Sequence, residues 1–212
     1  MSGRHRLPRR SRHPLGSAHT QLLLAAFLTG GSGALAVSSS AAQESSTEPP
    51  MTSGAGALPA AMLDPASAPV RINIPAIAVD AGMESLHRGA DSTLGIPAHW
   101  DDAGWYADGV VPGEPGSAVI VGHLDSIWTG PAVFYRLPAL QGGDTVLIKM
   151  GDGRSRRFVV DSSHEYAKSD FPTKSVYGSS ARAELRLITC IGPYDRAKHN
   201  YLDNLIVIAH AV

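Results

Sequence analysis

The segment Leu185–Gly192, "LRLITCIG", carries the clearest β-strand pattern of the chain and contains Cys190, the only cysteine of the 212 residues. Its side chains alternate between two faces, which is the period of a strand. Arg186 and Ile188 fall on one predicted face, and Cys190 comes at the end of the strand, just before Gly192. The segment therefore predicts a strand that carries a single thiol to its end. Leu185, Leu187 and Thr189 form the opposite face.

Other short apolar segments, rich in β-branched residues and separated by glycine- and proline-containing turns, have the same character. Many short strands at this spacing favour an all-β barrel or sandwich. Two segments, Ala132–Leu140 and Lys168–Ala183, predict a turn or two of helix. The fold class is therefore mainly β with short helices. The other predicted strands are Val70–Pro75, Ser117–His123, Asp144–Met150, Arg156–Ser162 and Asn204–His210.

Charge is distributed unevenly along the chain, although the net charge is only −1. Residues 1–43 hold five arginines and no acidic residue, whereas the remainder holds 13 basic and 19 acidic residues, a net charge of −6. An acidic body lacks the basic stripe that nucleic acid binding requires. We therefore expect no nucleic acid partner.

The N-terminus, residues 1–37, resembles an export signal. Five arginines precede the apolar run Gln21–Val37, "QLLLAAFLTGGSGALAV". A basic region before an apolar one is typical of a signal peptide, with a small-residue cleavage site near Ala42, or of an uncleaved membrane anchor. A buried helix is the third interpretation. Either export interpretation predicts that the rest of the chain lies outside the cytoplasm.

Residues 38–69 are rich in Ser, Ala, Pro and Gly and show no apolar period. Such a segment buries too little surface to offset its ordering entropy, so we expect a disordered linker. A single folded domain is then predicted over residues 70–212.

Cys190 is either a nucleophile or a small buried hydrophobic residue. A nucleophilic thiol needs a base nearby. His123 is the best candidate among the histidines because it also ends an apolar strand, "AVIVGH", and is followed by Asp125, which we expect to fix the loop. The alternative is a histidine that only caps its strand. Two neighbouring strand ends would place the imidazole and the thiol together.

The order of these segments resembles the sortase family, and is most similar to the actinobacterial class F sortases. The matching segments are "PGEPGSAVIVGHLDS", "GPAVFYRLPALQGGD", "LRLITCIGPYD" and "YLDNLIVIAH". The resemblance covers about residues 70–212. It implies a closed β-barrel of about seven or eight strands with short helices.

The resemblance also implies an activity. A sortase of this kind is a cysteine transpeptidase that cleaves an LPXTG-like sorting signal between Thr and Gly. The thiol of Cys190 would form an acyl-enzyme, which an amine from a peptidoglycan precursor or another protein resolves. The implied location is the Gram-positive cell envelope, either anchored in the cell membrane by the N-terminal segment or secreted.

The family places an arginine beside its histidine and cysteine, in many members just before the segment that matches "DNLIVIAH". Here Tyr201, Leu202 and Asp203 occupy that stretch. A guanidinium is suited to holding a substrate carbonyl and a developing oxyanion. The candidates are Arg196 in the following loop, which we prefer, and Arg186 on the cysteine strand.

Four residues are expected to contact the sorting signal: Thr189, Phe171, Val176 and Tyr177. The resemblance implies that the loop before the cysteine strand lines the groove for the signal. Simple packing is the alternative for each of them. The sequence suggests no cofactor and no metal site. Two other functions stay open, namely an L,D-transpeptidase-like or other cell-wall cysteine acyl-transferase, and a catalytically weak, tethered peptide-binding barrel. L,D-transpeptidases usually cluster His, Gly and Cys, whereas His123 and Cys190 are 67 residues apart.

Overall fold

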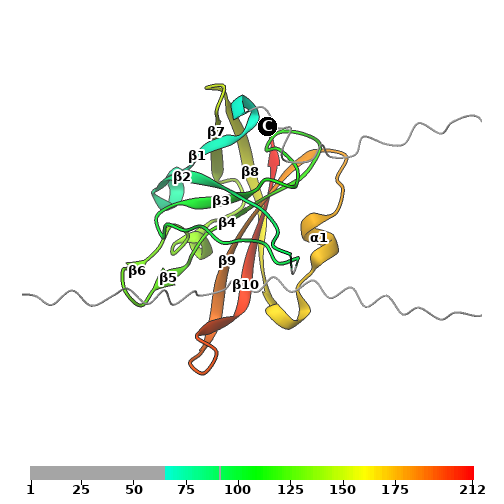
Figure 1. Ribbon diagram of the computed structural model, residues 1–212. Helices are drawn as coiled ribbons and strands as arrows, with labels where there is room; N and C mark the ends of the chain where they lie inside the picture. Colours follow the sequence, from blue (N-terminus) through cyan, green and yellow to red (C-terminus); the bar gives the residue numbers. More distant parts are fainter. Residues whose placement is uncertain (1–64, 91) are drawn as a thin grey trace, which may run out of the picture.

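Eight strands close into one barrel in the computed structural model, which describes residues 65–90 and 92–212. Their order around the barrel is β1-β2-β3-β4-β9-β10-β8-β7, and β1 pairs with β7 to close it (Figure 1). The barrel strands are β1 Pro69–Ile74, β2 Val79–Leu86, β3 Ala103–Tyr106, β4 Gly116–Val121, β7 Thr145–Met150, β8 Ser155–Ala167, β9 Ala183–Asp195 and β10 Asn200–Ala211. Most neighbours are antiparallel, but β2 pairs with β3 and β4 with β9 in parallel.

The remaining elements are short. A two-stranded ribbon, β5 Asp125–Ser126 and β6 Gly130–Pro131, follows β4. The helical elements are η2 Pro65–Ser67, η3 Pro75–Ile77, η4 Leu137–Ala139, η5 Lys168–Asp170 and α1 Thr173–Tyr177. In the described residues no helix has the length and hydropathy to cross a membrane.

The strands β4 and β9 are buried on both faces, which explains their nearly continuous apolar sequences. Leu185 and Leu187 of β9 pack into the barrel interior with Trp105 and Phe134. The other face of the strand contributes to a second apolar cluster outside the barrel. That outer cluster consists of Leu86, Leu94, Val119, Val121, Val176, Ile188, Cys190 and Ile206.

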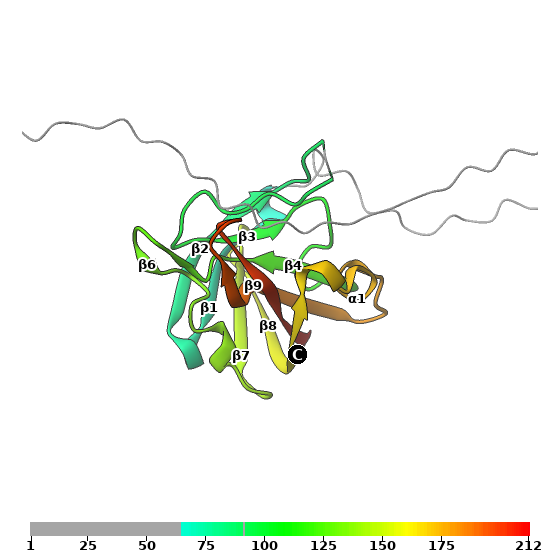
Figure 2. The same cartoon turned by 90° about the horizontal axis from the view of Figure 1, so that it is seen from below.

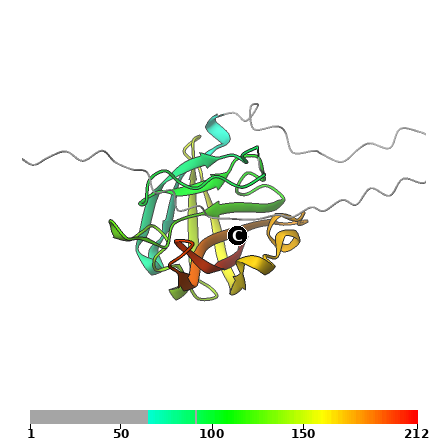
Figure 3. The ribbon, with the colours of Figure 1, turned by 60° about the horizontal axis from the view of Figure 1, so that its bottom comes forward.

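Seen from other directions, the hairpin of β9 and β10 lies between the β5–β6 ribbon on one side and α1 on the other (Figures 2 and 3). The same arrangement is visible in Figure 1, where the tip of the hairpin extends below the barrel. The β9–β10 hairpin is thus flanked by two short segments, the β5–β6 ribbon and α1.

The predicted mainly β barrel with short helices is confirmed, with eight barrel strands. Each of the six predicted strands is present, and β8, β9 and β10 are longer than predicted. β2 and β3 were not predicted because their sequences, "VDAGMESL" and "AGWY", lack a clean alternation. The two helical predictions correspond to η4, and to η5 with α1.

Regular structure begins a few residues before the predicted domain start at Val70. η2 and the first residue of β1 precede Val70, and the carbonyl groups of Ala66 and Ala68 accept hydrogen bonds from Asp152 and Gly151. These bonds attach the segment to the turn between β7 and β8. The predicted leader, residues 1–37, and the predicted linker up to residue 64 lie outside the described residues.

Candidate active site

His123 and Cys190 both lie just beyond the end of the parallel pairing between β4 and β9. The last pair of this parallel ladder joins Val121 to Ile188, so His123 and Cys190 each follow it by two residues. The Gly122 amide donates to the Ile188 carbonyl at 3.0 Å, which extends the pairing by one residue. β4 itself ends at Val121, whereas β9 continues past Cys190 to Asp195, so Cys190 lies within its strand and not at its end as predicted.

His123 is buried and held on two sides. Gly122 allows the chain to pass closely, because a Cβ there would lie 2.5 Å from the Phe134 ring. The carbonyl of His123 accepts a hydrogen bond from the Phe134 amide at 2.9 Å. The Trp100 ring packs against the imidazole with 4.1 Å between ring centroids.

The tautomer of His123 follows from its partner. Nε2 lies 3.0 Å from the carbonyl oxygen of Pro97, which can only accept a hydrogen bond. Nε2 therefore carries the proton, and Nδ1 is the nitrogen that can take up another. Burial lowers the pKa of His123 below its ordinary value, although the Pro97 carbonyl partly opposes this.

Cys190 is 5% exposed and belongs to the outer apolar cluster. Burial raises the pKa of its thiol, and the positive charge of Lys168 partly offsets that effect. The Nζ atom of Lys168 lies 3.4 Å from Sγ. A cation thus contacts the candidate nucleophile directly.

Polar contacts around the thiol connect three segments of the chain. Lys168, at the start of η5, donates to Oδ1 of Asn200 at 2.6 Å. The Tyr201 hydroxyl donates to Oδ2 of Asp125 at 2.7 Å. Asn200 and Tyr201 begin β10, so this strand anchors both the lysine and the loop after β4, in agreement with the predicted loop role of Asp125.

Arg196 is exposed in the turn between β9 and β10. It comes directly after β9, which ends at Asp195, and the β9–β10 pairing has a register shift between Tyr201 and Asp203. The assignment of Arg196 as the catalytic arginine therefore stays a prediction.

Arg186 is buried, and its guanidinium is already engaged. Nη2 pairs with Oε2 of Glu184 at 2.6 Å, and Nε donates to the Ser175 carbonyl at 3.4 Å. These contacts turn the side chain toward α1. Its position four residues before Cys190 corresponds to about 13 Å along the strand.

Three of the four predicted substrate contacts lie in the outer apolar cluster. Val176 is fully packed there, and Phe171 and Tyr177 are partly buried against it. Burial raises the pKa of Tyr177 to about 12. Cys190 belongs to the same cluster, so the thiol and these side chains share one apolar surface.

Thr189 lies on the other face of β9. It is completely buried, and its hydroxyl donates to the Gly122 carbonyl at 2.9 Å. The side chain therefore joins the ends of β4 and β9 instead of facing the surface around Cys190. This matches the packing alternative for Thr189.

Asn204 was not singled out by the sequence, yet it is directly opposite Cys190 in the β9–β10 ladder. It is 1% exposed, and neither Oδ1 nor Nδ2 has a hydrogen-bond partner. Unpaired buried amides are rare and costly in proteins. This amide is therefore an unusual feature of the strand next to the thiol.

One group of side chains has a geometry that could hold a metal ion. Glu84, His99 and Asp102 each bring one ligand atom within 4.8 Å of the others. Glu84 also accepts hydrogen bonds from the amides of Ala98 and His99, and Asp102 accepts one from Gly82. The spacing of these residues in the sequence gave no indication of the group, which folding of the loop before β3 creates.

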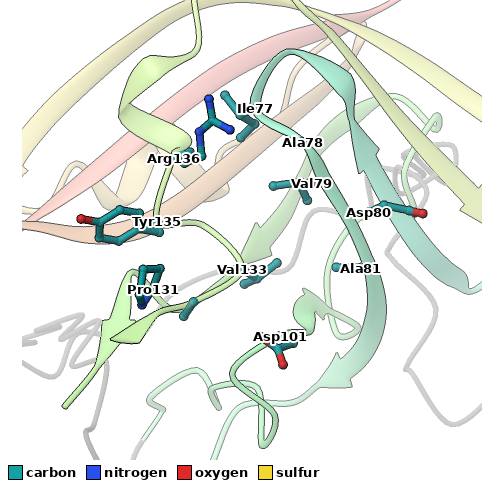
Figure 4. Close-up of a pocket in the computed structure, with 11 residues that line it drawn as sticks. Ile77, Ala78, Val79, Asp80, Ala81, Asp101, Pro131, Val133, Tyr135 and Arg136 are labelled. Atoms are coloured by element: carbon teal, nitrogen blue, oxygen red, sulfur yellow. The ribbon is translucent and has the colours of Figure 1, made fainter. Parts of the chain in front are cut away.

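A surface pocket of about 610 Å³ lies away from the thiol (Figure 4). Residues 77–81, 131–133, 135 and 136, together with Asp101, line it. None of the predicted site residues is among them. The sequence-based site and this cavity are therefore separate features.

Sequence reasoning missed Lys168, Asn200 and the pairing role of Tyr201. Lys168 is 22 residues before Cys190 in the chain, and Asn200 is ten residues after it. Only the pairing of β8 with β10 and of β9 with β10 brings them together. The one signal available was the lack of a cation in the stretch Tyr201–Asp203.

Solved structures similar to this one are sortases. Sortase A from Corynebacterium diphtheriae superposes with a TM-score of 0.53 and 25% identity, over 68% of this chain and 60% of that one. Sortase C-1 from Actinomyces oris gives a TM-score of 0.53 and 25% identity, over 71% and 74%. The pilus-related sortase C of Group B Streptococcus, at 18% identity, shares the fold with a TM-score of 0.55 over 76% of both chains.

The chain thus spans 60% of the length of the diphtheria enzyme. No curated protein matches it in sequence. The family model described as "Sortase domain" matches residues 72–212, which include every barrel strand beyond the first residues of β1. This match covers most of the described chain, and the barrel places His123 and Cys190 just beyond the end of the β4–β9 pairing. The chain belongs to the sortase family.

Proposed function

We propose that this protein is an exported cysteine transpeptidase that cleaves an LPXTG-like sorting signal and transfers the new carboxyl end to an amine. The observation that carries the proposal is the position of His123 and Cys190, which follow the last pair of the parallel β4–β9 ladder by the same number of residues. An acyl transfer needs a nucleophile and a base within reach of the same carbonyl.

In the first half-reaction, Nδ1 of His123 takes the thiol proton and Sγ of Cys190 attacks the threonine carbonyl carbon. A C–S bond forms, and the carbonyl π electrons move to oxygen. Collapse of this intermediate breaks the C–N bond to glycine, and the imidazolium gives its proton to the leaving amine. The product is a thioester on Cys190.

In the second half-reaction, an incoming amine attacks the thioester and gives its proton to His123. The C–S bond breaks, and the sulfur recovers a proton from the imidazolium. No electrons are gained or lost overall, since one amide is exchanged for another. Water in place of the amine gives hydrolysis.

The apolar part of the sorting signal is proposed to lie on the outer cluster beside Cys190, against Phe171, Val176 and Tyr177. All three share an apolar surface with the thiol. Tyr177 also contacts Tyr106 edge-to-face, and the guanidinium of Arg88 stacks on the Tyr177 ring at 5.2 Å. These contacts hold the α1 side of the surface in one conformation.

The finer assignments rest on the sequence. The segments quoted above support the class F subtype, and the basic, apolar N-terminus supports export with membrane anchoring or secretion. A peptidoglycan precursor or a second protein is the proposed amine donor. The mechanism above assigns no step to Arg196, which is exposed in the turn after β9.

The experiment is turnover of a fluorogenic LPXTG-like peptide in the presence of hydroxylamine. We expect release of the glycine-containing fragment, formation of the threonine hydroxamate, and loss of both in Cys190→Ala. Unchanged turnover in Cys190→Ala contradicts the mechanism. Binding of the peptide without any turnover points instead to a peptide-binding barrel.

A further inference from the structure

Among the described residues, the cation that contacts the candidate nucleophile is Lys168, the first residue of η5, which follows β8. Arg196 is exposed in the turn between β9 and β10, and Arg186 is turned toward Glu184. Nζ of Lys168, in contrast, is 3.4 Å from Sγ. The stretch Tyr201–Asp203 has no basic residue, and the ammonium group of Lys168 supplies a positive charge beside the thiol instead.

We propose, on the basis of the transpeptidase function above, that Lys168 is a catalytic residue whose ammonium group stabilises the Cys190 thiolate and then the oxyanion of each acyl-transfer intermediate. Lysine carries a compact positive charge with three N–H donors. The Sγ atom and Oδ1 of Asn200 account for two of them.

The third N–H is positioned for the substrate. The oxyanion forms on the carbon that Sγ attacks, so it lies one bond beyond the new C–S bond. A donor at 3.4 Å from Sγ is close to the place where that negative charge develops. When Sγ bonds to the carbonyl carbon, the negative charge passes from sulfur to oxygen, and the ammonium can shift toward that oxygen.

Asn200 restricts the lysine. A lysine side chain is flexible and does not offer the rigid fork of arginine. The hydrogen bond of 2.6 Å from Nζ to Asn200 holds the ammonium at the first residue of β10, on the edge of the site. The flexible chain thus has a fixed end point beside the thiol.

The surrounding charges agree with this role. The Asp125 carboxylate raises the pKa of Cys190 and Lys168 lowers it, while burial is the largest influence and raises it. Tyr201 also interacts with the thiol and is hydrogen-bonded to Asp125. Tyr106, Tyr166 and Tyr177 pack against the same apolar cluster as Cys190. Lys168 is therefore the group that favours the thiolate over the neutral thiol.

The test compares Lys168→Met, Lys168→Gln and Lys168→Arg with the wild-type full chain. Lys149→Met is the matched control, since it removes the same charge from an exposed position on β7. Two quantities are measured for each protein. One is the rate of Cys190 alkylation by iodoacetamide as a function of pH, which is specific because the chain has a single cysteine. The other is kcat/KM with the LPXTG-like peptide.

We expect the alkylation midpoint of Lys168→Met and Lys168→Gln to rise by about 1 pH unit, the lower end of the effect of an adjacent opposite charge. Their kcat/KM should fall by about 100-fold, as for other lost oxyanion donors. Lys168→Arg should recover most of both quantities because it restores the charge. Thermal unfolding of each variant verifies its fold. If Lys168→Met does not fold, the comparison rests on Lys168→Gln.

An alkylation profile of Lys168→Met and Lys168→Gln equal to that of Lys149→Met overturns the proposal. So does a kcat/KM within about threefold of the wild type in both variants, a change that corresponds to less than one donor. If the wild type itself shows no turnover, the transpeptidase function is contradicted, and the alkylation profiles still decide whether Lys168 acts on the thiolate.

Discussion

Burial acts on His123 and Cys190 in opposite directions on the pKa scale but toward the same protonation state. It lowers the pKa of the imidazole and raises that of the thiol. Both shifts favour the neutral form of the group concerned. Because the two groups exchange one proton, the pair titrates as a unit.

This pairing predicts a broad pH profile of kcat/KM for the peptide. The enzyme is active while the Cys190 thiol and Nδ1 of His123 together hold one proton. Activity is lost at low pH, where a second proton binds at His123. It is also lost at high pH, where Cys190 gives up the one proton that remains. The acid limb should therefore lie below about 6.5 and the alkaline limb above about 8.5, the ordinary values of His and Cys. A plateau narrower than this interval contradicts the assignment.

At the scale of elements, Arg186 ties β9 to α1 and to Glu184. Burial raises the pKa of Glu184, but hydrogen bonds from Arg182 and Arg186 outweigh it, and the pKa is lowered overall. A carboxyl group with a lowered pKa in the folded state stabilises the protein above its unfolded pKa. That contribution is lost as the pH falls through the folded pKa.

We therefore predict that Arg186→Met lowers the free energy of unfolding by about 2 kcal/mol at pH 7, as expected for a lost charged hydrogen-bonding group. The deficit should shrink below about pH 4, where the unfolded chain begins to bind a proton at Glu184 while the folded chain still holds the carboxylate. Urea unfolding at both pH values measures it. A folded Arg186→Met protein with normal stability and a kcat/KM more than 100-fold lower would instead make Arg186 the catalytic arginine.

The sequence predicted those elements whose pattern is local. β4 and the first half of β9 alternate or run apolar, and this local pattern is what singles out His123 and Cys190 as candidates. The contact between Lys168 and Cys190 depends on how two hairpins pair, and no local pattern encodes it. The preference for Arg196 rests on its place in the sequence, and its role stays a prediction.

At the scale of the whole molecule, the barrel closes on itself within residues 69–211 through the β1–β7 pairing. Its interior cluster draws side chains from all eight barrel strands. A closed sheet leaves no unpaired barrel edge, and one contiguous core is what an independent domain requires. The barrel itself was implied by the family resemblance, since alternation alone did not separate a barrel from a sandwich.

We predict that residues 65–212, produced alone, fold cooperatively and process the soluble peptide with the kcat/KM of the full chain, within about threefold. Residues 65–68 are kept because they bind the β7–β8 turn. Circular dichroism during thermal unfolding and the peptide assay test this. A piece that stays unfolded, or that folds but has lost activity, would show that the preceding segment completes the domain.

The most direct test of the central claim, that Cys190 forms an acyl-enzyme, is the mass of the protein trapped during turnover. The wild type is mixed with an LPXTG-like peptide, quenched in acid and measured by intact and peptide-mapping mass spectrometry. We predict an adduct equal to the peptide up to threonine less water, located on Cys190, removed by hydroxylamine and missing in Cys190→Ala. Peptide cleavage without such an adduct, or an adduct on another residue, would contradict the account.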